Sequence, residues 1–359
     1  MTITIYKGFF SNQRIIMGKP TDGLHMTIYD ISEKAGVSIA TVSRVMNGSS
    51  NVSEKTKQKV LDVIKQYEYT PNVFARGLGL NTMKTIGILC ADSSDLYIAK
   101  AIYYLERLLR ANGYDNILCC SGYELHSKEK SMNLLITKKV DAIILVGSTY
   151  VHETPADNQY IFNAAAQVPV MLLNGILDIP NVYSIASNDY ASVYDATRYL
   201  LHSGIHNILY YYPSDSYSGK RKIAGFQDAM KDANLPLTDA MIRYYPGDRE
   251  NIPEMARYLK KIAETVDFDA VIAADDTLAM GAYQYALSAG LSIPEDLSII
   301  GCNNSMLVNC CAPALTSIDN KLESLCEHLI TTLMEVLGGN DMPKTTVVPG
   351  ELILRGTTR

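Results

Sequence analysis

Residues 37–49, VSIATVSRVMNGS, gather hydroxyl side chains around one arginine, Arg44. A guanidinium group can make two hydrogen bonds to the edge of a guanine base, and serine and threonine hydroxyls can bond to phosphate oxygens. The segment therefore has the chemistry of a nucleic-acid contact. A helical hairpin with an ordinary solvated face would use the same residue types, so the surrounding elements have to be considered.

Two short helices joined by a tight turn would position these groups. Thr27 and Asp30 fit a capping box at the start of a first helix, and Gly36 can end that helix in a left-handed conformation. Ser38 can cap a second helix, whose buried side would consist of Val42, Val45 and Met46. Its outward face, which could enter a major groove, would carry Ile39, Ala40, Ser43 and Arg44.

A third helix and a short linker follow. Ser53 can cap the third helix, and Pro71 can stop it. Its predicted apolar side consists of Val60, Ile64 and Tyr67. Asn72 can cap a further helix of only about two turns, which is marginal alone in water and needs a partner to form.

Charge is distributed unevenly along the chain. Residues 1–85 hold 11 Lys and Arg against 6 Asp and Glu, a net charge of +5, whereas residues 86–359 hold 21 against 32, a net charge of −11. A basic head on an acidic body suggests that the head meets a polyanion. A solvated basic face would give the same asymmetry.

Beyond residue 85, apolar strand patterns alternate with helix-length segments, which predicts an α/β body of parallel sheets buried on both faces. The runs are TIGILCA, NILCC, DAIILVG, VPVMLLN, NILYYYP, AVIAA and LSIIGC. The pattern restarts near VYSIASNDYASV, so we expect two doubly wound subdomains with a boundary near residue 187. A late return through PALTSIDN would place the C-terminal segment back on the first. Ligands of such sheets bind at the carboxyl ends of the strands.

Several classes of site find no support in the sequence. The seven cysteines include no C-x-x-C pair and suit reduced core positions, and the six histidines show no H-E-x-x-H spacing. We expect no metal, no cofactor and no catalytic nucleophile. Ser11, Asn12, Gln13 and Arg14 interrupt the apolar start, so no signal peptide is expected, and no stretch is long enough to span a membrane. The cytoplasm is the expected compartment.

The order of TIYDISEKAGVSIATVSRVMNG, SEKTKQKVLDVIKQYEYTPNVFARGL and TIGIL resembles the LacI/GalR family of bacterial transcriptional regulators. The resemblance implies an all-α helix-turn-helix headpiece over residues 26–71, a hinge helix and linker over 72–84, and a periplasmic-binding-protein-like effector and dimerisation domain over 85–359. Late crossovers between its two subdomains would fall near 303–320. Residues 1–25 precede the usual family start and are expected to be a disordered extension or an upstream start-site artefact.

The resemblance also implies which residues contact DNA. The base-reading positions would be Ile39, Ala40 and Arg44, and the positions that touch phosphate or flank the bases would be Tyr29, Ser38, Thr41, Ser43, Asn47, Ser53 and Thr56. The hinge positions would be Asn72, Ala75, Arg76 and Leu78. Leu78 would wedge into a minor-groove step and kink the duplex. Because Gly77 and Gly79 weaken this helix, we expect it to order only on DNA.

The effector pocket implied by the resemblance lies between the two subdomains. Its residues would be Tyr97, Ile98, Ser148, Ser187, Asn188, Arg221, Lys222, Arg249, Asp275, Asp276 and Asn303. Three of them depart from the common family pattern: Asn303 stands where Asp is usual, Lys222 where Arg is usual, and Ser187 where Asp is common. The identity of the ligand therefore does not transfer.

The cations of this set suggest a ligand class. Arg221, Lys222 and Arg249 could neutralise a carboxylate or phosphate, which favours an acidic sugar or a sugar phosphate. They could equally form rim ion pairs with acidic neighbours, namely Asp215, Asp248 and Glu250. Asp276 could simply cap the helix that follows it.

The function implied is repression of carbohydrate-use genes by a homodimer on a near-palindromic operator in double-stranded DNA, controlled by a small sugar-like effector. No heptad tail for tetramer formation is present. Whether the effector releases or tightens DNA binding stays open. Two alternatives remain: a sugar-converting enzyme, which needs a metal or nucleophile constellation, and a transporter's solute-binding protein, which needs an export signal.

Overall fold

The computed structural model describes residues 26–46, 51–67, 69 and 82–359, and the chain divides into two compact units, Met1–Asn81 and Thr82–Arg359. We refer to them as the headpiece and the effector unit. Among the described residues, no helix has the length and apolar character needed to cross a membrane. No group of three or more His, Cys, Asp or Glu among them is placed to hold a metal ion.

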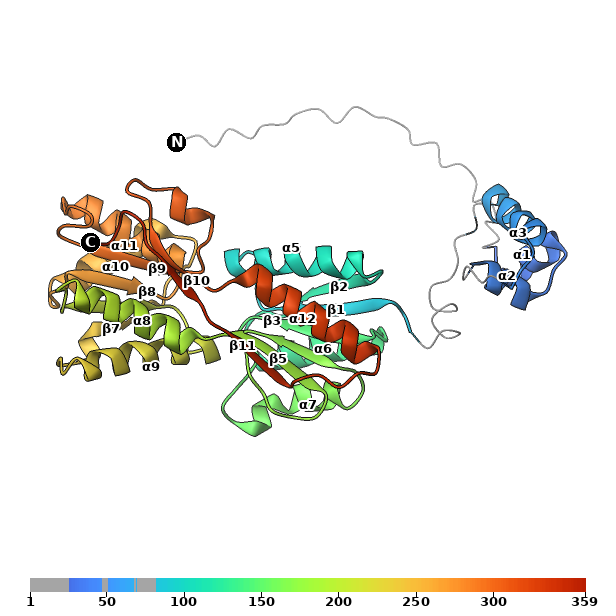
Figure 1. Cartoon of the computed structure of the whole chain (residues 1–359), viewed down its shortest axis with the longest axis horizontal. Coiled ribbons are helices and arrows are strands. Elements are labelled where there is room, and N and C mark those ends of the chain that lie inside the picture. Colours follow the sequence, from blue (N-terminus) through green and yellow to red (C-terminus); the bar gives the residue numbers. More distant parts are fainter. Residues whose placement is uncertain (1–25, 47–50, 68, 70–81) are drawn as a thin grey trace, which may run out of the picture. The chain divides into compact units, whose positions relative to one another are not determined.

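The described residues of the headpiece form three helices, α1 (Ile28–Ala35), α2 (Ile39–Met46) and α3 (Glu54–Gln66) (Figure 1). The Thr27 and Asp30 capping box starts α1, and Gly36 ends it at φ 59°, as predicted. The Ser38 hydroxyl accepts a hydrogen bond from the Thr41 amide at 3.2 Å and so caps α2. The core of the headpiece consists of Ile31, Ala35, Val42, Val45 and Val60.

The predicted apolar side of α3 is wrong at Tyr67. This residue lies at the C-terminal cap of the helix, where it is 39% exposed, and the Lys34 ammonium lies 4.5 Å from the centre of its ring. Val63 and Tyr69 pack against the core instead. Because α3 ends at Gln66, the apolar side of the helix does not extend to Tyr67.

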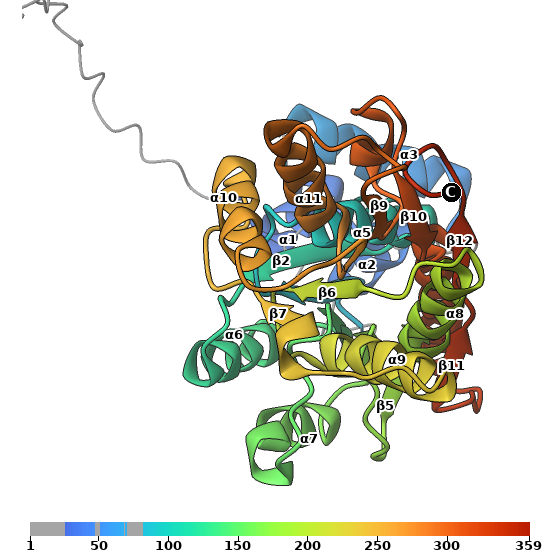
Figure 2. The ribbon, with the colours of Figure 1, turned by 90° about the vertical axis from the view of Figure 1, so that its left-hand side faces the viewer.

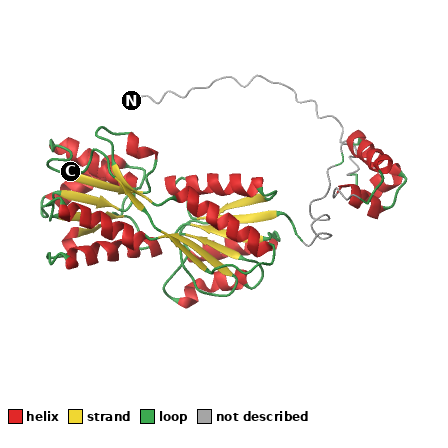
Figure 3. Ribbon diagram, viewed as in Figure 1, coloured by secondary structure: helices red, strands yellow, loops and turns green. Residues whose placement is uncertain are grey.

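The effector unit contains two six-stranded sheets, each between two layers of helices (Figure 3). In the first sheet all neighbouring strands are parallel, in the order β11-β5-β4-β3-β1-β2. Its strands are β1 (Thr85–Cys90), β2 (Asp115–Cys120), β3 (Ala142–Val146), β4 (Val170–Leu173), β5 (Val182–Ser187) and β11 (Thr345–Val348). Helices α5 (Leu96–Ala111) and α12 (Leu322–Leu337) cover one face, and α6 (Leu125–Thr137) and α7 (Gln159–Ala165) cover the other.

The second sheet has the order β12-β10-β9-β8-β6-β7, parallel except for the antiparallel pair β10 and β12. Its strands are β6 (Ile208–Tyr212), β7 (Ile242–Tyr244), β8 (Ala270–Ala273), β9 (Ser298–Cys302), β10 (Thr316–Asp319) and β12 (Glu351–Ile353). Helices α8 (Asp189–His202) and α9 (Tyr217–Asp232) lie on one side, and α10 (Ile252–Ala263) and α11 (Asp276–Ala289) on the other (Figure 2). The predicted headpiece and doubly wound body are confirmed.

The chain passes between the two subdomains at several points. It leaves the first sheet between Ser187 and Asn188, where β5 ends and α8 begins. The strand in PALTSIDN, β10, pairs within the second sheet, and only after it do α12 and β11 lie with the first (Figure 1). A last passage at residues 349–350 returns β12 to the second sheet. These connections place the carboxyl ends of both sheets around one cleft.

Candidate DNA interface and effector pocket

The outward face of α2 carries the side chains predicted to read bases. Ile39 is 38% exposed, and Ala40 and Arg44 are exposed as well. No carboxylate of the described residues lies within 4 Å of the Arg44 guanidinium. Val42 and Val45 hold the opposite side of α2 in the core, which fixes the direction of the exposed face.

Apart from Ser43, the described residues predicted to touch phosphate lie on α1 and at the starts of α2 and α3. Tyr29 on α1 is 68% exposed. Two Ser and Thr pairs, Ser38 with Thr41 and Ser53 with Thr56, join their hydroxyls at 2.9 Å at the starts of α2 and α3. Helix N-termini present unpaired amides that attract phosphate oxygens. Ser43 is half-buried, and Asn47, Asn72, Ala75, Arg76 and Leu78 lie outside the described residues.

A cavity of about 450 Å³ in the effector unit is lined at the carboxyl ends of strands from both sheets. We call it the effector pocket. The segments after β1, β2, β3 and β4 supply one wall, and those after β6, β7, β8 and β9 supply the other. Seven of the predicted residues line it: Tyr97, Ile98, Ser148, Lys222, Arg249, Asp275 and Asn303. This arrangement follows from the topology, because parallel strands bring their carboxyl ends to one edge.

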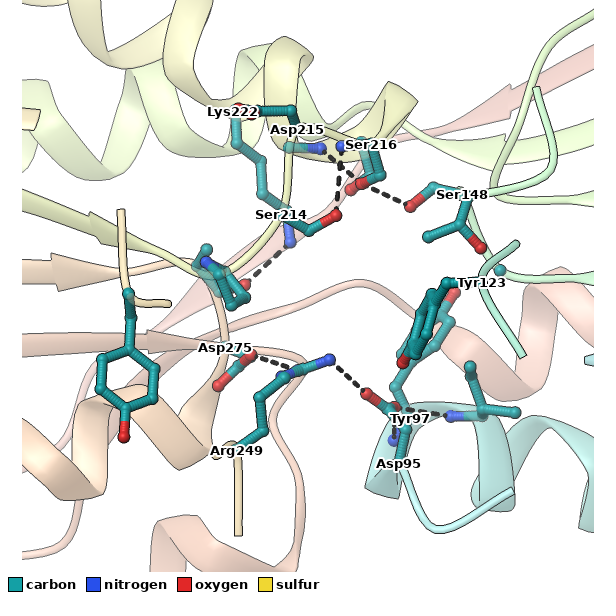
Figure 4. A pocket seen from close by; sticks show the side chains of 18 of the residues that line it. Asp95, Tyr97, Tyr123, Ser148, Ser214, Asp215, Ser216, Lys222, Arg249 and Asp275 are labelled. Atoms are coloured by element: carbon teal, nitrogen blue, oxygen red, sulfur yellow. Dashed lines mark hydrogen bonds and ion pairs between the residues drawn. The ribbon is translucent and has the colours of Figure 1, made fainter. Parts of the chain in front are cut away.

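Arg249 lies between carboxylates of the two subdomains (Figure 4). Its guanidinium is 3.0 Å from Asp95 of the first subdomain and 2.7 Å from Asp275 of the second. Burial alone would lower the pKa of Arg249, but the two carboxylates outweigh burial and raise it above its usual value. The predicted rim pairing to Asp215, Asp248 or Glu250 is therefore wrong for Arg249, which pairs inside the pocket.

Other polar groups also face the pocket. The Ser148 hydroxyl donates to the Ser216 hydroxyl at 2.9 Å, a second link between the subdomains (Figure 4). Lys222 is 6% exposed, and its ammonium donates to the Ala274 carbonyl at 3.0 Å. No carboxylate of the described residues lies within 4 Å of the Lys222 nitrogen. Aromatic rings supply much of the remaining wall: Tyr97, Tyr123, Tyr244 and Tyr245.

Four predicted pocket residues lie outside its lining. Ser187 is 6% exposed and donates to the Asp189 carboxylate at 2.8 Å, and Asn188 caps α8 by accepting from the Ala191 amide. Arg221 lies over the Tyr190 ring and lines a neighbouring cavity. Each of these side chains already has a structural partner that turns it away from the pocket.

Asp276 is the fourth, and its side chain is buried outside the lining of the pocket. Its carboxylate accepts from the Ser305 amide and the Ser317 hydroxyl, each at 2.6 Å, and the residue is 2% exposed. Burial raises its pKa, and these hydrogen bonds partly offset the rise. The side chain that caps α11 is Asp275, which accepts from the Leu278 amide, so the predicted capping role of Asp276 is wrong.

Sequence reasoning missed several residues of the pocket. The most consequential is Asp95, which caps α5 through Oδ1 and reaches Arg249 through Oδ2. Tyr123, Asn174 and Ser214 were missed too, although each follows the end of a strand within a few residues. Because each of these four residues follows a strand, its position in the sequence could have predicted that it lines the pocket.

Comparisons with known proteins agree on one family. The model described as bacterial regulatory proteins, lacI family, matches residues 27–72, and a periplasmic binding protein-like domain matches residues 197–358. A relative named HTH-type transcriptional regulator, from Lachnoclostridium phytofermentans, is 53% identical over 333 residues, which cover 93% of this chain and 99% of the relative.

Solved structures share the fold. The lac repressor dimer bound to operator and the anti-inducer ONPF has a TM-score of 0.81 at 23% identity, over 93% of this chain and 99% of that one. The complex of the transcriptional regulator CelR with cellobiose has a TM-score of 0.67 at 23% identity, over 92% and 99% of the two chains.

Proposed function

This chain belongs to the lacI family of bacterial regulatory proteins, and from that premise we propose that it represses carbohydrate-use genes under the control of a sugar-like effector. It is a DNA-binding transcriptional regulator and not an enzyme. The compartment proposed with this role is the bacterial cytoplasm, where the chromosome lies.

On DNA, the proposed active form is a homodimer on a near-palindromic operator. Each headpiece would place Arg44 at a guanine edge, with Ile39 and Ala40 in apolar contact beside it. The hinge would insert Leu78 at the centre of the operator, and the energy needed to unstack that base step would be offset by the contacts that bending permits.

The observation that carries the effector proposal is the Asp95–Arg249–Asp275 bridge among tyrosine rings. Sugar hydroxyls both donate and accept hydrogen bonds, so a sugar can bond to carboxylates and to a guanidinium at once. Tyrosine rings provide flat apolar surfaces for the faces of a sugar ring. A pocket with aromatic walls and a few fixed polar groups is typical of small-molecule sites.

An acidic or phosphorylated sugar is included in the proposal because of Lys222. This buried ammonium lies on the pocket wall with no carboxylate of the described residues within 4 Å. Burial alone would lower its pKa, but Cys302 and the more distant Asp189 and Asp275 outweigh burial and raise it, so Lys222 stays charged. Asn303, also on the wall, adds no negative charge that would repel an anion. Lys222 is therefore the group we expect to hold a carboxylate or phosphate substituent.

Effector control would act through the links between the subdomains. A ligand that replaces the Asp95–Arg249 and Ser148–Ser216 contacts with its own would change how far the cleft closes. A coupling of about 1–3 kcal/mol between the two sites would change operator occupancy roughly 5- to 150-fold.

A gel-shift titration on the near-palindromic site closest to the coding gene tests the DNA role. Arg44→Ala should weaken binding by about 1–3 kcal/mol and relax the preference for guanine at one position of each half-site. The matched control is Lys65→Ala, an exposed cation at the end of α3. Unchanged affinity and base preference in the Arg44 variant would contradict the proposed placement.

A thermal-shift screen of neutral sugars, sugar acids and sugar phosphates tests the effector. A ligand at 100 times its dissociation constant stabilises the folded protein by about 2.7 kcal/mol. Compounds that raise the melting temperature should also change operator affinity. A screen in which no sugar does either would contradict the sugar effector and leave the DNA role standing.

A further inference from the structure

A second cavity of about 850 Å³ adjoins the effector pocket. Tyr123, Thr149 and residues 214–216 line both cavities, so the two are neighbouring parts of one cleft. Sites for whole small molecules span roughly 300–1,000 Å³, and each of the two cavities reaches that size alone. The cleft is therefore larger than a single sugar ring requires.

One of the residues that line the second cavity is a buried lysine, Lys128. Lys128, in α6, is 2% exposed, and its ammonium donates to the Thr149 carbonyl at 2.6 Å. No carboxylate of the described residues lies within 4 Å of this nitrogen. Burial disfavours the charged form of Lys128 and lowers its pKa. The charge of Glu124 and the Tyr150 ring, whose centre lies 5.4 Å from the ammonium, offset this cost in part. The ammonium has further hydrogen bonds to donate.

His152 lies beside Lys128 on the wall of the second cavity. The imidazole Nε2 is 3.4 Å from the Lys128 nitrogen. Because an ammonium group only donates, Nε2 faces it as an acceptor, and the ring proton of the neutral imidazole is then on Nδ1. Burial, reinforced by the nearby Lys128 charge, lowers the pKa of His152, which favours this neutral form.

Two hydrogen bonds with Asn158 fix the loop that carries His152. Asn158, 2% exposed, accepts from the His152 amide at 2.8 Å and donates to the His152 carbonyl at 2.7 Å. A fixed loop reduces the ordering cost of binding. The other walls of the cavity include apolar and aromatic side chains: Phe162, Ile176, Leu177 and Tyr217.

Resting on the proposed sugar effector, we infer that the effector has at least two sugar rings, the first in the effector pocket and the second in the adjoining cavity. Lys128 and His152 contact hydroxyl groups of the second ring, and the apolar walls contact its face. The chain thereby distinguishes an oligosaccharide from the single sugar released by its hydrolysis.

Isothermal titration of the full chain with matched pairs of sugars tests this inference. The pairs are glucose with cellobiose, xylose with xylobiose, galactose with lactose, and mannose with mannobiose. The two-ring member of the recognised pair should bind at least about tenfold tighter than its single ring. Lys128→Met and His152→Ala should each reduce this ratio to below about threefold. Lys130→Met, an exposed lysine of the same helix, is the control and should keep the full ratio.

Each outcome decides something. The inference is overturned if a single ring binds as tightly as its two-ring partner. It is also overturned if the ratio of the two affinities stays unchanged in both the Lys128 and the His152 variants. The His152 variant alters an accessible loop, so it remains informative should the Lys128 variant lower the melting temperature. If no sugar of either size binds, and no sugar, sugar acid or sugar phosphate of the thermal-shift screen changes operator affinity, the sugar effector itself fails, and the inference fails with it.

Discussion

Asp95→Asn isolates the ion pair that crosses the effector pocket. Asp95 Oδ1 accepts from the Tyr97 and Ile98 amides and caps α5, whereas Oδ2 faces Arg249 at 3.0 Å. Asparagine retains an oxygen for the cap but offers Arg249 an amide group that cannot accept. The substitution therefore removes this ion pair between the subdomains, keeps the Ser148–Ser216 contact, and leaves the helix start intact.

The expected loss is modest because the pair is partly exposed. The Arg249 side chain is 40% exposed and that of Asp95 is 16% exposed, so solvent screens the attraction, and about 1 kcal/mol is expected. For a domain of this size the melting temperature should fall by about 2 °C. The loss should shrink at 1 M salt, where charges are screened within roughly 3 Å.

Thermal unfolding of wild type and Asp95→Asn at low and high salt measures this loss of stability, and Asp115→Asn is the control variant. Asp115 starts β2, is exposed, and its side chain makes no hydrogen bond or ion pair with the part of the chain that the structure describes, so its substitution removes the same charge without breaking a pair. Arg249→Gln should cost more, about 2 kcal/mol, since it also leaves the buried Asp275 carboxylate without its cation. The Asp95 and Arg249 double-mutant cycle should give a coupling of about 1 kcal/mol. A coupling free energy near zero would refute the reasoning, as would equal melting temperatures for the Asp95 variant and the Asp115 control.

Three further substitutions test other parts of the structure. Gly36→Val should destabilise the headpiece by about 1–2 kcal/mol because φ is 59° there, while Gly36→Asn should cost less; equal melting of the two variants would contradict this. Asp276→Asn tests a buried carboxyl group whose pKa is raised by burial. Because the folded protein binds this proton more tightly than the unfolded chain, lowering the pH from 7 to 4 should stabilise the wild type relative to the variant. Urea unfolding at both pH values measures the difference, and a difference that does not change with pH would contradict the prediction. Lys222→Met should weaken binding of a sugar acid or phosphate at least tenfold more than binding of the neutral sugar; equal losses in titration calorimetry would remove the anion role.

The fold could be predicted where local signals agree with the final packing. Thr27, Gly36 and Ser38 mark helix ends by side-chain chemistry that acts within a few residues, and each is at the expected place. The strands buried on both faces, such as β3, are continuous apolar runs. The short or exposed strands β7, β11 and β12 lack this signal, because their positions are set by pairing with distant parts of the chain.

The pocket was predicted only in part, for a related reason. Topology brings Ser148, Lys222 and Asn303 to the cleft, and counting from strand ends finds such residues. Side-chain direction is set by tertiary partners that the sequence does not reveal, as for Asp276, which is held by Ser305 and Ser317. The pairing of Arg249 with Asp95, 154 positions earlier in the chain, likewise depends on how the two subdomains meet.

The end of the chain closes both halves of the effector unit. β11 is the outermost strand of the first sheet, β12 is the outermost strand of the second, and Thr357 beyond them bonds to the Ile299 carbonyl at 2.7 Å. In the order of synthesis these strands come after all the other strands of their sheets, so neither half can complete its sheet until they have been made. Proteolytic trimming at residue 344 would strip an edge from each half in a single cut, and the two should lose their structure together.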